Sequence, residues 1–77
     1  MTIEEAFGRA IRELRKASHL SQEKLADMST LDRSFISLLE NGKKQPSLIT
    51  IFQLAKALNI SPSKILANVE EIIQSSK

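Results

Sequence analysis

The chain has 77 residues, enough for one small domain, and 42% of them are hydrophobic, so a single packed core is expected. It contains no cysteine, which excludes disulfides and cysteine-based metal sites, and no apolar run approaches the roughly 20 residues of a membrane span. No signal peptide is visible. The net charge is only +2, but residues 33–64 hold five basic residues and one acidic residue, a distribution that suits contact with phosphates or ordinary solubilising lysines.

One all-α domain of five helices is predicted for residues 1–77, because apolar residues recur at helical spacing and strand-like alternation is almost absent. The first helix should cover residues 3–17, with Thr2 and Glu5 forming a capping box at its start. Its apolar stripe consists of Ile3, Phe7, Ala10, Ile11 and Leu14. His19 follows as a helix-ending residue, since histidine tolerates a left-handed backbone better than most residues, and its sequence neighbours offer no partner for a metal or catalytic role.

Residues 21–41 are predicted to form two short helices joined by a tight turn. Ser21 caps the first, at residues 22–28, and Asp32 caps the second, at residues 33–40. The second helix should bury Phe35, Ile36 and Leu39 and point outward Arg33, Ser34, Ser37 and Leu38. A short exposed helix with arginine and serine in its first turn can lie in the major groove of DNA, so these four outward residues are the predicted base contacts.

Two more helices are predicted at residues 48–58 and 62–75, with Asn59 as a left-handed stop between them. The buried stripe of the fourth helix is expected to be Leu48, Ile51, Leu54, Ala55 and Leu58. In the fifth helix, Ile65 and Leu66 are enough to close the core. The apolar residues that then exceed what so small a core should bury are Val69, Ile72 and Ile73. These three predict that the last helix packs against its two-fold mate in a homodimer, with Ile49 or Phe52 as further contacts.

Residues 21–42, SQEKLADMSTLDRSFISLLENG, resemble the helix-turn-helix of the lambda-type repressor family (Cro/cI or Xre-like) of bacterial and phage transcription regulators. The flanks LRKASHLSQ and QPSLITIFQLAKALNIS also fit, so the resemblance covers nearly the whole chain. The run LDRSFIS is similar to the recognition helix of controller proteins from restriction-modification systems. The resemblance implies a five-helix DNA-binding domain with an extended C-terminal helix. The family prefers glycine where Thr30 stands, so either Thr30 is strained or this turn differs from the family's.

The same resemblance implies roles for residues outside the recognition helix. Arg15 on the first helix should bind Glu40 at the end of the recognition helix; the alternative is two exposed charges of little energetic value. Gln22 should bind a phosphate and brace Arg33, the first residue of the recognition helix. Ser21 and the backbone N–H groups beside it offer the same anion site.

Arg33 is the predicted base reader, because its guanidinium can engage both acceptor atoms of guanine; a phosphate contact or a surface pair with Asp32 is the alternative. Lys43 and Lys44 follow the recognition helix and are predicted to bind phosphates, unless they are free solvated side chains. Leu38 departs from the polar residue that the family often has here. It either touches a thymine methyl group or is merely exposed.

These residues together predict a cytoplasmic, sequence-specific transcription regulator that binds double-stranded DNA at a two-fold operator as a homodimer. It is expected to act as a repressor or controller protein, with RNA polymerase as a further partner in activation. The alternative class is a protein-interaction module, an antitoxin or adaptor that keeps the fold without reading DNA. The sequence shows no catalytic constellation, cofactor motif or metal-ligand cluster, so neither enzymatic activity nor a cofactor is expected.

Overall fold

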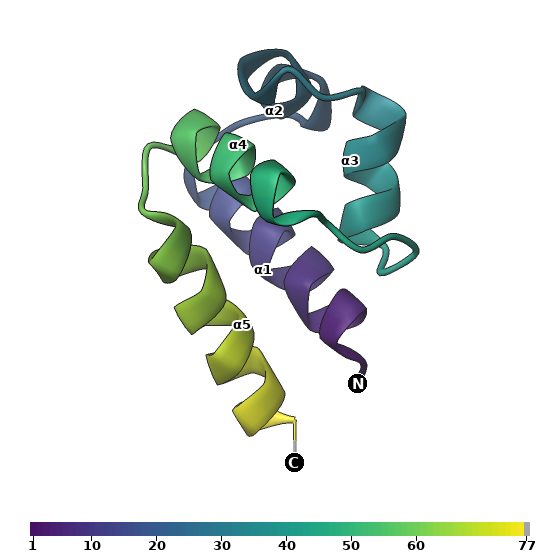
Figure 1. The fold of residues 1–77 in the computed structure, drawn as a ribbon, viewed down its shortest axis with the longest axis vertical. Coiled ribbons are helices and arrows are strands. Elements are labelled where there is room, and N and C mark those ends of the chain that lie inside the picture. The colour runs from purple at the N-terminus through teal and green to yellow at the C-terminus, as the bar shows by residue number, and fades with distance from the viewer. Residues whose placement is uncertain (77) are drawn as a thin grey trace.

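The computed structural model describes residues 1–76 and is built from five α-helices (Figure 1). They are α1 (Ile3–Ala17), α2 (Gln22–Ser29), α3 (Arg33–Glu40), α4 (Leu48–Leu58) and α5 (Pro62–Ser75). In Figure 1, α1 lies between α5 and α3, and α5 packs antiparallel beside it. The start of α1 and the end of α5 lie at the same end of the described structure, which measures 35 × 23 × 23 Å. The predicted all-α, five-helix fold is confirmed.

Side chains at the N-caps fix where the helices begin. Thr2 and Glu5 form the predicted capping box of α1, in which each side chain accepts a hydrogen bond from the other residue's backbone N–H. The hydroxyls that accept the first-turn N–H groups of α2, α4 and α5 belong to Ser21, Ser47 and Ser61. Asp32 occupies the N-cap of α3 with extended backbone, but its side chain makes no capping hydrogen bond among the described residues. That part of the prediction was wrong, and α3 therefore depends on other contacts for its position.

Four helices end in the same hydrogen-bonded motif, each with one residue in the left-handed conformation. At the end of α3, the N–H of Gly42 donates to the carbonyl of Leu39 at 3.1 Å and the N–H of Lys43 to that of Leu38 at 2.9 Å. This pair of bonds defines the Schellman motif. The left-handed residues, with φ in parentheses, are His19 (59°), Thr30 (58°), Gly42 (72°) and Asn59 (58°). Thr30 thus does adopt the strained conformation that its β-branched side chain disfavours.

The residue that follows each left-handed position differs at one of these four helix ends. After α1, α2 and α4 it is apolar, half-buried and packed against the core: Leu20, Leu31 and Ile60. Such an apolar contact commonly accompanies the motif and anchors the departing chain. After α3 the corresponding residue is Lys43, which is exposed. The turn after α3 is therefore the one of the four that has no apolar residue at this position.

The core contains six large side chains with no exposed surface: Ile11, Leu25, Ile36, Leu39, Leu54 and Ile65. Two residues that the apolar stripes placed in the core are instead exposed, Ile3 at 70% and Leu48 at 69%. Each is the first residue of its helix. Leu66, expected to close the core, is also exposed.

The helix α5 buries more of its apolar surface within the single chain than the sequence suggested. Val69 is 6% exposed and Ile72 is 8% exposed, and Ile73 is half-buried against the core. They are covered because α5 packs along α1 and α4. The interpretation that these three residues exceed what one subunit can bury was wrong, so they no longer argue for a dimer through α5.

Candidate nucleic-acid interface

The helix α3 is held by its buried face and leaves the opposite face uncovered. Ile36 and Leu39 are fully buried, and Phe35 is half-buried against the same core. The predicted base-contacting residues fall at positions 33, 34, 37 and 38, which share the other side of the helix. Of these, Arg33 and Ser34 are exposed, Leu38 is 39% exposed and Ser37 is half-buried. The structure thus gathers the four residues on one surface, with Arg33 and Ser34 exposed at the start of the helix.

The C-terminal end of α3 is fastened to α1 and α2 through Glu40, which is only 4% exposed. Arg15 forms a two-pronged ion pair with it, Nε to Oε2 at 2.6 Å and Nη2 to Oε1 at 3.0 Å. Arg15 also donates to the carbonyl of Leu20 at 2.7 Å, so the buried guanidinium is well supplied with acceptors. Arg15 and Glu40 therefore form the ion pair that the resemblance implied, and they form it in the interior.

Two further side chains converge on the same carboxylate. Gln22 donates from Nε2 to Oε1 of Glu40 at 3.1 Å, and Arg12 approaches the same oxygen with Nε at 3.5 Å. Gln22 was expected to brace Arg33 at the start of α3, and the structure instead joins it to Glu40 at the end. The carboxylate of Glu40 consequently connects α3 to both α1 and α2.

The charge balance at Glu40 keeps this carboxylate ionised. Burial would raise the pKa of Glu40, but the hydrogen bonds from Arg15, Gln22 and Arg12, with the charge of Arg15, outweigh it. The pKa of Glu40 accordingly lies below its ordinary value of 4.5. The hydrogen bonds to Glu40 raise the pKa of Arg15 in turn. Both partners are therefore charged at neutral pH.

One face of α1 packs against the end of α3 and the turn that follows it. The residues of this face are Glu5, Gly8, Arg12 and Arg15, spaced by three, four and three positions, as neighbours on a helix are. A Cβ added to Gly8 would lie 2.2 Å from the carbonyl oxygen of Leu39, so the two helix backbones are almost in contact there. Sequence reasoning found Arg15 and missed Arg12, although its position three residues earlier placed it on the same face.

The predicted phosphate-contacting residues lie at both ends of the helix-turn-helix. Ser21 is exposed at the start of α2, where its hydroxyl accepts the N–H of Lys24 at 3.0 Å. Gln22 is half-buried because its amide is bonded to Glu40. Lys43 and Lys44 are exposed on the turn after α3. The start of α2 and the exposed lysines of the turn thus both lie near the C-terminal end of α3, whereas Arg33 is exposed at its start.

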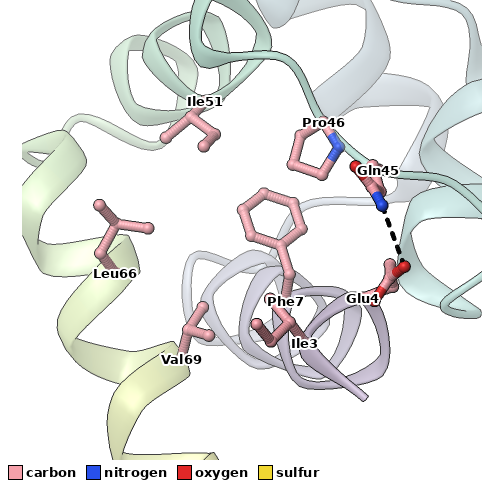
Figure 2. Close-up of a pocket in the computed structure, with 8 residues that line it drawn as sticks. All are labelled: Ile3, Glu4, Phe7, Gln45, Pro46, Ile51, Leu66 and Val69. Carbon is pink, nitrogen blue, oxygen red and sulfur yellow. Dashed lines mark hydrogen bonds between the residues drawn. The ribbon is translucent and has the colours of Figure 1, made fainter.

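An apolar hollow of about 320 Å³ lies on another part of the surface (Figure 2). It is lined by Ile3, Glu4, Phe7, Gln45, Pro46, Ile51, Leu66 and Val69. At one rim, Gln45 Nε2 donates to Glu4 Oε2 at 3.1 Å. None of the predicted DNA-contacting residues lines this hollow. Over residues 1–76, the structure holds no helix long and apolar enough to cross a membrane.

Residues 11–65 match the model of a protein family described as helix-turn-helix. The chain belongs to this helix-turn-helix family. The matched segment of this helix-turn-helix protein runs from the middle of α1 to the first turn of α5 and contains all the predicted DNA-contacting residues and the Arg15–Glu40 pair. The resemblance drawn from residues 21–42 is thereby confirmed.

Controller proteins are prominent among the relatives of this helix-turn-helix protein. Control protein C.SmaI of Serratia marcescens is 41% identical over 66 residues, which are 86% of this chain and 79% of that protein. The restriction-modification controller protein C.AhdI from Aeromonas hydrophila is 47% identical, with a TM-score of 0.79 over 80% of this chain and 94% of that chain. Controller protein C.Esp1396I, crystallised as a tetramer with its natural 35 base-pair operator, matches with a TM-score of 0.88 over 96% and 97% of the two chains. At 23% identity, this last likeness is one of fold.

Proposed function

We propose that this protein is a non-enzymatic, sequence-specific transcription regulator that binds double-stranded DNA in the cytoplasm. The observation that carries the proposal is the contrast between the two sides of α3. One side is immobilised by the core and by the Arg15–Glu40 pair, and the other presents an exposed arginine and two serines to the outside. A rigid helix with an uncovered polar face is what major-groove reading requires. The similarity to controller proteins supports the proposal that DNA binding by this protein regulates transcription.

We assign the base contacts and the phosphate contacts to different parts of this surface. Arg33 reads a base, and Ser34, Ser37 and Leu38 lie beside it in the groove. The phosphate contacts fall to Ser21 and the N–H groups at the start of α2, and to Lys43 and Lys44 after α3. Gln22 contributes through its backbone at that helix start, because its side-chain amide is already bonded to Glu40.

Arg33→Ala and Lys43→Ala should separate base reading from phosphate binding. After the bound site is selected from random DNA, Arg33→Ala should cost about 1–3 kcal/mol per half-site on that DNA and little on random DNA. Lys43→Ala should weaken binding to both DNAs alike and lower the slope of log K against log salt by about one. Titrations of both variants on both DNAs at two salt concentrations supply the comparison.

Equal losses on the two DNAs for Arg33→Ala would remove its role as a base reader and leave specificity to its neighbours or to DNA shape. A wild-type protein whose weak DNA binding shows neither sequence preference nor salt dependence would instead be an interaction module such as an antitoxin or adaptor.

We infer that the protein binds as a homodimer, because two half-sites about 34 Å apart supply the binding energy that one short helix lacks. The surface we assign to the interface is on α4 rather than α5. Ile49 and Phe52 are 73% and 56% exposed and border a shallow hollow of about 410 Å³ that also contains Ile60 and Pro62. A patch with both protruding and recessed apolar parts can pair with its own copy about a two-fold axis.

Phe52→Asp should therefore give folded monomers that bind the selected site much more weakly than the wild type, as sedimentation and titration would show. Leu66→Asp is the matched control, because Leu66 is an exposed apolar residue of α5 outside the α4 patch. If Leu66→Asp breaks the dimer and Phe52→Asp does not, the interface belongs to α5 after all.

We further propose that the bound dimer represses transcription by blocking RNA polymerase. At promoters where it activates transcription, it does so by contacting RNA polymerase. Transcription in vitro from a promoter carrying the selected site, with and without the protein, distinguishes the two effects.

A further inference from the structure

The turn after α3 is fastened to the domain differently from the turns after α1, α2 and α4. Those three turns have the apolar anchors Leu20, Leu31 and Ile60, whereas the turn after α3 has the exposed Lys43 at the equivalent position. Without an apolar anchor, the turn needs another attachment if its position is to be fixed. Both phosphate-contacting lysines of the proposed interface, Lys43 and Lys44, lie on this turn.

Polar side chains of α1 supply the attachments, with Glu4 bonded to Gln45 after the two lysines and Arg12 bonded ahead of them. Arg12 donates from Nη2 to Oδ1 of Asn41 at 2.9 Å, and the same nitrogen lies 3.5 Å from the carbonyl oxygen of Glu40. Directly after Asn41, the turn passes so close to α1 that a Cβ on Gly42 would lie 2.9 Å from the Cγ of Glu5. Arg12 thus holds both the last residue of α3 and the first residue of the turn, where a cation also suits the negative end of the helix.

We propose that Arg12 is a positioning residue that fixes the turn after α3 and so determines where Lys43 and Lys44 meet the DNA backbone. This inference rests on the proposed DNA-binding function. Arg12 from α1 takes the place of the apolar anchor that the other three turns have. The anchor position of this turn can therefore hold a lysine, Lys43. A guanidinium suits this role because its planar fork can reach two acceptors at once.

The first test needs no DNA. Arg12→Met removes the guanidinium and keeps the apolar stem, so the turn should open more often and the amide hydrogens of Gly42 and Lys43 should exchange about fivefold faster, the factor that one ordinary hydrogen bond gives. Arg9→Met is the matched control, because it removes the same charge from α1 but only an exposed pair with Glu13. Unchanged exchange at both amides in Arg12→Met would overturn the proposal. Arg12→Lys keeps the charge without the fork, and it should show the same faster exchange even if the methionine variant is too unstable to measure.

The second test is a double-mutant cycle in DNA binding. Arg12→Met should weaken binding to the selected site about fivefold in the wild-type background and less than twofold in Lys43→Ala/Lys44→Ala, because the turn then carries no lysines to position. Equal losses in both backgrounds would show that Arg12 touches phosphate directly, which contradicts the positioning role. A wild-type protein that binds no DNA would refute the proposed function, while the exchange test would still decide whether Arg12 holds the turn.

Discussion

Glu40→Ala is expected to lower the free energy of unfolding by about 3–5 kcal/mol, measured by urea denaturation at neutral pH. The loss is large because Arg15, only 9% exposed, would keep its charge in the interior with the carbonyl of Leu20 as its remaining acceptor. Gln22 and Arg12 would lose their shared acceptor at the same time. A domain of this size has only about 5–15 kcal/mol of stability, so the variant should be marginally folded.

Glu13→Ala provides the matched control within the same chain. Glu13 also pairs with an arginine, Arg9 at 3.1 Å, but both side chains are more than half exposed and lie one turn apart on α1. Such a pair contributes about 0.5 kcal/mol or less. If Glu40→Ala costs no more than Glu13→Ala, the buried network contributes nothing beyond a surface pair.

Lowering the pH should remove the contribution that the Glu40 carboxylate makes to stability. Because the pKa of Glu40 lies below 4.5 in the folded state, its contribution to stability is fully present above that pH and is lost as the pH falls through the lower folded value. Glu40→Gln should be less stable than the wild type at pH 7 and lose less stability on going to pH 3. The remaining acid sensitivity should include Glu5, whose pKa the backbone and side chain of Thr2 lower within the capping box. Identical pH dependence in the two proteins would mean that Glu40 does not titrate in this range.

Gly8→Ala is expected to destabilise the domain by about 3 kcal/mol, although alanine is the better helix former. The added Cβ would lie 2.2 Å from the carbonyl oxygen of Leu39 and 2.7 Å from that of Glu40. Both atoms belong to backbone, so α1 and α3 would have to separate. Because α3 carries the proposed reading surface, binding to the selected site should weaken as well.

The ordinary effect of glycine in a helix can be measured at Ala67, which is exposed in the middle of α5. Ala67→Gly should lose about 1 kcal/mol from propensity alone. If propensity also governed position 8, Gly8→Ala would gain a similar amount. Thermal unfolding of both variants decides between these signs, and a stabilised Gly8→Ala would show that the two helices part at little cost.

The sequence allowed the helix boundaries to be predicted closely, because caps and stops are local. Thr2, Ser21 and Asn59 each act through bonds within a few residues. Burial at helix ends and along α5 was predicted less well, since it depends on which elements pack together. Ile3 continues the stripe of α1 but is exposed at the first position of the helix, and Val69 is covered by neighbours that the period of α5 does not specify.

In the candidate site, too, features within one helix could be predicted from residue spacing, whereas contacts between helices could not. The spacing within α3 gathers Arg33 and Ser34 on one face, and the resemblance supplied the pair of Arg15 with Glu40. The bonds from Arg12 to Asn41 and from Gln22 to Glu40 depend on distances between helices, which the sequence pattern does not contain.

Four helices share one kind of ending, yet only one of the four left-handed positions holds glycine. Glycine samples more conformations than other residues in the unfolded chain, so each glycine adds entropy that folding must remove. His19, Thr30 and Asn59 restrict the unfolded ensemble and accept local strain in the folded state instead. The two glycines of the chain stand where a Cβ would strike another segment, Gly8 beneath α3 and Gly42 against the start of α1. Both glycines therefore mark places where two segments approach closely, and only Gly42 also occupies a left-handed turn position.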